Sequence, residues 1–118
     1  MVDARKTFGT QEESRAAEYL ASLGYKILAR QYRSRVGEID LVAQEGDEII
    51  FVEVKARRSN LYGYPEESVT EQKIQKILRM GEYYLRENNC VDAPYRIDVI
   101  AIEGEGKTAK LTHLQRIW

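Results

Sequence analysis

The sequence predicts a mixed α/β fold, in which a central mixed β-sheet is flanked by helices. Segments with apolar residues at helical spacing are interleaved with short β-branched segments, and the chain changes between the two patterns several times. The chain has 118 residues, of which 43% are hydrophobic and 31% charged, so it can build one core. We therefore expect residues 1–118 to form a single domain with the element order α-β-β-β-α-β-β.

The first expected element is a helix that begins at a capping box. Thr10 and Glu13 have the spacing of an N-cap residue and a third helical residue. Apolar residues then recur at helical spacing, namely Ala16, Ala17, Leu20 and Leu23. Gly24 follows and predicts the end of the helix.

Three strands are expected after this helix. Residues 25–32 alternate apolar with polar or long side chains and lead into an arginine cluster. Residues 36–43 and 48–56 are rich in Ile, Val, Leu and Phe, and residues 44–47 between them include Gly46 and acidic residues. This pattern predicts a β-hairpin with its turn at residues 44–47.

The second half of the chain predicts a helix and two strands. Residues 59–68 are expected to form a loop, and a helix should begin near Thr70 and stop at Asn88 or Asn89. Its apolar face comprises Ile74, Ile77, Leu78, Gly81, Tyr84 and Leu85. Residues 95–102 and 111–118 are the last two expected strands.

The composition excludes several classes of function. The chain has one cysteine and one histidine, which cannot form an internal disulfide or a Cys/His zinc site. No apolar run is long enough for a membrane span, and the first residues lack the apolar core of a signal peptide, so we expect a cytoplasmic protein. The net charge of -1 counts mildly against nucleic-acid binding, although local basic clusters remain.

Charged side chains lie in the predicted hairpin, where burial alone would not place them. Because side chains alternate along a strand, Glu53 and Lys55 share one face, about 6.6 Å apart along the strand, while Val52 and Val54 point to the other. A turn with an even number of residues would place Asp40 opposite residue 51, as a diagonal neighbour about 7–8 Å from Glu53.

This pattern favours a metal site, although a solvent-exposed sheet face with opposite charges is an alternative. Two carboxylates at such a separation can share Mg²⁺ or Mn²⁺, which prefer oxygen ligands. A nearby lysine can hold a water or offset charge growing on a phosphate, which suits hydrolysis of a phosphodiester. Charges opposite one another on an exposed sheet face are also common, but in apolar strands an uncompensated charge requires a partner or a metal.

The segments "GEIDLVA", "FVEVKARR", "GYPEESVTEQK" and "YRIDVIAI" carry a resemblance to a known family. Together with the first helix they resemble the UPF0102 (YraN-like) family of the PD-(D/E)xK, or restriction-endonuclease-like, superfamily, which includes archaeal Holliday-junction resolvases. The resemblance implies a restriction-endonuclease-like core and Mg²⁺- or Mn²⁺-dependent cleavage of nucleic acid, expected here to be DNA. Resolvase-like relatives work as dimers, so a homodimer is also expected.

The resemblance assigns roles to residues of this chain. Asp40 and Glu53 match the metal-binding acids, Lys55 matches the catalytic lysine, and the carbonyl of Val54 matches a further metal ligand. Glu13 matches an acid that resolvase-like members add to the metal site, while its place in the capping box leaves a structural role open.

Several other charged residues are expected to support this site. Salt bridging to an arginine is the expected role of Glu38, and an internal ion pair is expected between Arg96 and Asp98. Nucleic-acid contacts are expected from Arg33, Arg35, Arg57, Arg58 and Lys73. The alternative function is a module on the same fold that binds nucleic acid or a partner through its arginines without cutting.

Overall fold

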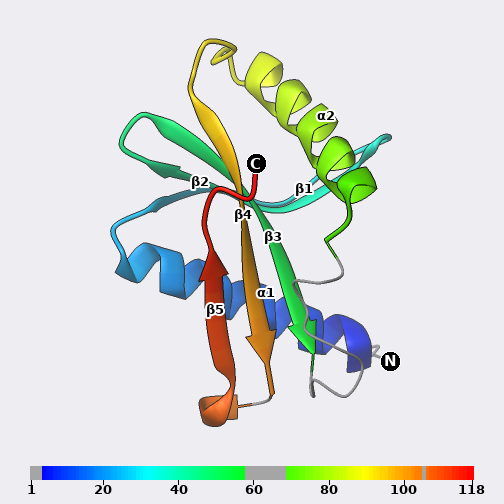
Figure 1. The fold of residues 1–118 in the computed structure, drawn as a ribbon, viewed down its shortest axis with the longest axis vertical. Coiled ribbons are helices and arrows are strands. Elements are labelled where there is room, and N and C mark those ends of the chain that lie inside the picture. The colour runs from blue at the N-terminus through cyan, green and yellow to red at the C-terminus, as the bar shows by residue number, and fades with distance from the viewer. Residues whose placement is uncertain (1–3, 58–68, 105) are drawn as a thin grey trace.

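Two helices cover opposite faces of a five-stranded sheet in the computed structural model, which describes residues 4–57, 69–104 and 106–118 (Figure 1). The elements are α1 (Ala4–Ser22), β1 (Lys26–Ser34), β2 (Gly37–Glu45), β3 (Glu48–Arg57), α2 (Glu71–Glu87), β4 (Tyr95–Glu103), the short 3₁₀ helix η2 (Gly106–Thr108) and β5 (Lys110–Leu114). Apart from η2, this order confirms the predicted α-β-β-β-α-β-β arrangement.

The sheet follows chain order, β1-β2-β3-β4-β5, and is mixed because β3 and β4 are parallel while the other neighbours are antiparallel. A parallel pair needs a crossover connection, which here contains α2. The hairpin between β2 and β3 pairs Glu45 with Glu48, which leaves Gly46 and Asp47 as a two-residue turn. Gly46 has a φ of 61°, a backbone conformation that glycine adopts without steric cost.

Each face of the sheet buries its own apolar layer. Alternate residues of β2 and β3, such as Leu41 and Val52, pack with α1 through Ala16 and Leu20. The intervening residues pack with α2; these are Val42, Ile49 and Phe51. The alternation of strand side chains thus explains why both faces are covered.

The apolar face predicted for α2 is confirmed. Ile77 and Leu85 are buried, and Ile74 and Leu78 pack partly buried against the same layer. Gly81 allows this helix to approach the sheet closely, because a Cβ atom at this position would lie 2.5 Å from a ring carbon of Phe51.

The start of the first helix differs from the prediction. Since α1 begins at Ala4, Thr10 lies inside the helix, where backbone N–H groups have intrahelical partners and need no cap. The capping-box interpretation of Thr10 and Glu13 is therefore wrong. No helix of the described residues is long and apolar enough to cross a membrane.

The end of the chain also differs from the prediction. β5 ends at Leu114, and Arg116 has a φ of 54°, which turns the backbone out of the strand. The N–H of Ile117 then donates to the carbonyl of Ile97 at 2.9 Å. Trp118 stacks on Tyr95 with ring centroids 5.6 Å apart, so the final residues return to β4.

Candidate metal centre

Asp40 lies at the point where β2 and β3 stop pairing. The last pair of this ladder is Leu41 with Val52, and the same register continued by one residue brings Asp40 to Glu53. The predicted pairing of residue 40 with residue 51 is wrong, because the turn has two residues and not the four at 44–47. Instead of a strand pair, Asp40 makes a side-chain contact, in which its Oδ2 accepts the N–H of Val54 at 2.7 Å.

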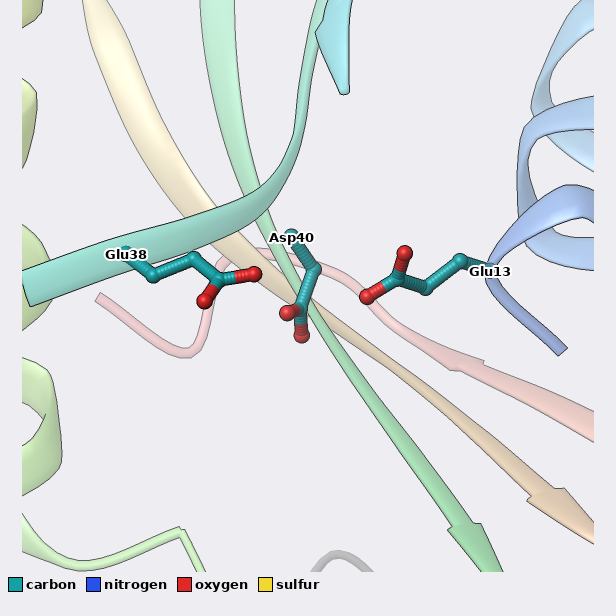
Figure 2. A group of neighbouring side chains, drawn as sticks. All are labelled: Glu13, Glu38 and Asp40. Carbon is teal, nitrogen blue, oxygen red and sulfur yellow. The ribbon is translucent and has the colours of Figure 1, made fainter. Parts of the chain in front are cut away.

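Three carboxylates converge at this position. Glu13 comes from α1, and Glu38 and Asp40 come from β2; each contributes an oxygen, and these oxygens lie within 4.8 Å of one another. Figure 2 shows the three side chains pointing toward a common centre, with Asp40 between the other two. Helix and strand segments far apart in the sequence thus build one group of oxygen donors.

The environment of Asp40 disfavours its ionised form. Burial is the main cause, and the negative charges of Glu53, Glu13 and Glu38 add to it, so that the pKa of Asp40 is raised to about 8. The hydrogen bond from Val54 acts in the opposite direction but is outweighed. Without a cation, Asp40 therefore retains its proton to a higher pH than a free aspartate does.

Glu38 belongs to this acidic group, although the sequence predicts no metal-binding role for it. Its predicted salt bridge is confirmed, since Arg33 Nε lies 3.3 Å from Glu38 Oε2. The signal that could have found it is the spacing of two residues from Asp40, which in a regular strand places both side chains on one face.

Glu53 and Lys55 form an ion pair beside the acidic group. Lys55 Nζ lies 3.1 Å from Glu53 Oε1, and both side chains are largely buried. Burial alone would lower the pKa of Lys55, but the charge of Glu53 and further contacts raise it overall, which keeps the ammonium protonated. Val54 and Val52 face the α1 layer as predicted. The carbonyl of Val54 as a metal ligand stays a prediction.

Lys73 brings a second ammonium group to Lys55. It lies in the first turn of α2, where its N–H donates to the N-cap side chain of Thr70 at 3.3 Å. The pKa of Lys73 is lowered chiefly by its contact with Lys55, because two ammonium groups at close range repel each other. Lys73 of α2 and Lys55 of β3 thus lie in side-chain contact.

The structure describes most, but not all, of the basic residues that are predicted to contact nucleic acid. Arg33 and Arg35 are exposed near the end of the β1–β2 hairpin, and Arg57 is partly buried in the last position of β3. Arg58 lies outside the described residues. The exposed arginines are thus on the same hairpin as Glu38 and Asp40.

Arg96 and Asp98 form the predicted internal ion pair, with Arg96 Nε donating to Asp98 Oδ1 at 2.9 Å. Both side chains are buried, and Arg96 also donates to Glu48 at 2.6 Å and to the hydroxyl of Tyr25 at 3.1 Å. This pair belongs to the core and does not form part of the acidic group.

His113 joins the same network from β5. β5 is an edge strand of the sheet, yet the side chain of His113 is only 4% exposed. The neutral tautomer with hydrogen on Nε2 satisfies both of its contacts, with Asp98 Oδ2 at 2.8 Å and with the Tyr19 hydroxyl at 3.2 Å.

Replacing Asp40 by asparagine is expected to stabilise the metal-free protein at pH 8. Because the folded pKa lies above the unfolded value, ionisation of Asp40 opposes folding, and stability falls as pH rises from about 4 to about 8. Asp40→Asn should remove this slope and increase the free energy of unfolding at pH 8 by about 1–3 kcal/mol. Urea unfolding in EDTA between pH 5 and 8.5 would measure it.

The matched control for this experiment is Asp92→Asn, which changes an exposed aspartate. It should leave the pH dependence of unfolding as in the unmodified chain. If both variants follow the same pH curve, the unfavourable ionisation of Asp40 in the fold is contradicted.

The comparisons with known proteins agree with one another. The model of the family described as "Uncharacterised protein family UPF0102" matches residues 12–102. A UPF0102 protein of Clostridioides difficile is 47% identical over 97 residues, which cover 82% of this chain and 85% of that protein. A UPF0102 protein of Pelotomaculum thermopropionicum is 40% identical over 117 residues and 98% of both chains. The matched region contains the three converging carboxylates, the Glu53–Lys55 pair and Lys73, and the chain belongs to the UPF0102 family.

Proposed function

We propose that this protein is a metal-dependent nuclease that hydrolyses phosphodiester bonds of DNA, with Mg²⁺ or Mn²⁺ as its cofactor. The observation that carries the proposal is the convergence of carboxylate oxygens from Glu13, Glu38 and Asp40 within 4.8 Å. Hard oxygen donors fit a hard divalent cation. The raised pKa of Asp40 supports this fit, because it shows that the ionised carboxylate lacks a compensating positive charge, which a cation would supply.

Some residues of this site would bind the metal cofactor, and others would contact the substrate. Asp40 and Glu13 would hold the ion, with Glu53 and the Val54 carbonyl as the neighbouring ligands that the resemblance implies. The bound ion would supply Lewis-acid activation of the phosphate. Glu53 orients the Lys55 ammonium, which would offset charge growing on the phosphate during cleavage.

The basic residues at the rim would bind the DNA backbone. Arg33 and Arg35 are exposed on the β1–β2 hairpin, where Arg33 pairs with Glu38, and Lys73 stands next to Lys55. Contacts of this kind fix the position of a duplex without reading its sequence. The resemblance to the PD-(D/E)xK superfamily supports DNA as the substrate and a homodimer as parts of the same proposal. A cytoplasmic location is the remaining part, and it rests on the sequence pattern alone.

A Mn²⁺ titration followed by a cleavage assay tests the proposal. The protein should bind Mn²⁺ at millimolar or lower concentrations and, with Mg²⁺ or Mn²⁺, should nick or cut linear or branched DNA. Asp40→Asn should lose both properties, while Asp92→Asn should keep them. Calorimetry or Mn²⁺ electron paramagnetic resonance measures the binding, and gel electrophoresis of labelled DNA measures the cleavage.

The contrary outcome would favour the module that binds without cutting. In that case no Mn²⁺ would bind at millimolar concentrations. DNA or RNA binding would need no metal, would fall steeply with salt and would depend on Arg33, Arg57 or Arg58. The observation that favours this second function is the exposure of Arg33, whose side chain is 65% exposed.

A further inference from the structure

Gln31 has a backbone conformation that is unusual for a residue inside a strand. Its φ is 50°, in the left-handed region that residues with a side chain seldom adopt, and such strain is concentrated at functional sites. The pairing of β1 with β2 passes from Arg30–Leu41 to Tyr32–Ile39, so neither Gln31 nor the opposite residue, Asp40, is one of the paired positions. The irregularity of β1 thus lies directly across from the central acid.

The left-handed backbone at Gln31 allows two successive side chains of β1 to contact the same helix, α1. In a regular strand, neighbours such as Arg30 and Gln31 point to opposite faces. Here Arg30 Nη2 donates to Ser14 Oγ at 2.7 Å, and Gln31 Nε2 donates to Glu13 Oε2 at 2.8 Å. The left-handed backbone therefore allows β1 to clamp the turn of α1 that carries Glu13.

We propose that Gln31 is a positioning residue of the metal site, which holds the carboxylate of Glu13 in the orientation that the ion requires. This inference rests on the proposed function. A neutral amide suits the task, because it fixes a carboxylate without neutralising the charge that attracts a cation. Hydrogen bonds of this kind to metal ligands typically contribute about 10- to 100-fold in affinity.

The contacts of Gln31 extend from Glu13 to the other outer acid. Gln31 Oε1 accepts from Arg33 Nη2 at 3.5 Å, and Arg33 pairs with Glu38 at 3.3 Å. Gln31 and Arg33 thus connect the two carboxylates that flank Asp40. The side-chain freedom of Glu13 is lost when the protein folds and not when the metal binds, which favours binding.

Two variants of Gln31 test the inference through Mn²⁺ affinity. Gln31→Gly removes the amide and tolerates the left-handed backbone, whereas Gln31→Met keeps the side-chain size without a donor. Both should weaken Mn²⁺ binding by about 10-fold. The matched control is Asn89→Gly, which changes an exposed residue with a φ of 55° at the end of α2 and should leave Mn²⁺ affinity unchanged.

A double-mutant cycle with Glu13→Ala identifies the route of the effect. If Gln31 acts through Glu13, Gln31→Gly should weaken binding by less than about 2-fold once Glu13 is absent. Equal weakening in both backgrounds, or no weakening in the unmodified background, would overturn the role of Gln31 while leaving the metal site in place. A failure of the unmodified chain to bind Mn²⁺ would overturn the proposed function and this inference together.

Discussion

Lys55→Ala is expected to slow phosphodiester cleavage by roughly 10²–10³-fold without unfolding the protein. The ammonium lies 3.1 Å from Glu53, beside the acids that would hold the ion, so it is placed to offset charge that develops on the phosphate. Removing it should lower the rate of the chemical step more than substrate affinity. Single-turnover cleavage at saturating Mg²⁺, with thermal unfolding in parallel, would measure both effects.

Metal affinity separates the role of Lys55 from that of the acids. Lys55→Ala removes a positive charge near the cation, so Mn²⁺ should bind equally well or more tightly. Asp40→Ala and Glu53→Ala should lose cleavage together with metal affinity. Lys107→Ala, at an exposed lysine of η2, is the matched control and should cleave normally. Normal cleavage by the Asp40, Glu53 and Lys55 variants would contradict the site assignment.

The central part of the candidate site could be predicted from the sequence because it depends on local rules. The alternation of side chains places Glu53 and Lys55 on one face of β3 and Val54 on the other, and the structure confirms this. The proximity of Asp40 depended on the turn. Any turn with an even number of residues keeps Asp40 and Glu53 on the same face of the hairpin. Only the two-residue turn brings these two residues opposite each other along the strands.

The remaining part of the site depends on contacts that no local pattern encodes. Glu13 reaches the acidic group because α1 packs across the sheet, and the irregular backbone of Gln31 follows from tertiary contacts and not from strand propensity. Glu38 has the spacing of a site residue, but nothing in the sequence shows that its carboxylate turns toward Asp40 and Glu13 while it also pairs with Arg33.

The buried network around Asp98 connects the position of α1 with the end of the chain. Asp98 accepts Arg96 Nε, His113 Nε2 and the N–H of Arg116, each between 2.8 and 2.9 Å. Through His113 the network reaches Tyr19, which lies on the same helix as Glu13. The packing that holds Glu13 near β2 therefore depends partly on a polar group remote from the acidic cluster.

Asp98→Ala is consequently expected to destabilise the fold by about 3–5 kcal/mol, because it leaves the buried cation of Arg96 and the ring of His113 without their common acceptor. Asp98→Asn keeps the shape and some hydrogen bonds, so its cost should be smaller, about 1–3 kcal/mol. Urea unfolding at pH 7 measures both, with Asp92→Ala, an exposed change, as the control. A loss below about 1 kcal/mol for Asp98→Ala would show that the network orders the chain end without stabilising the core.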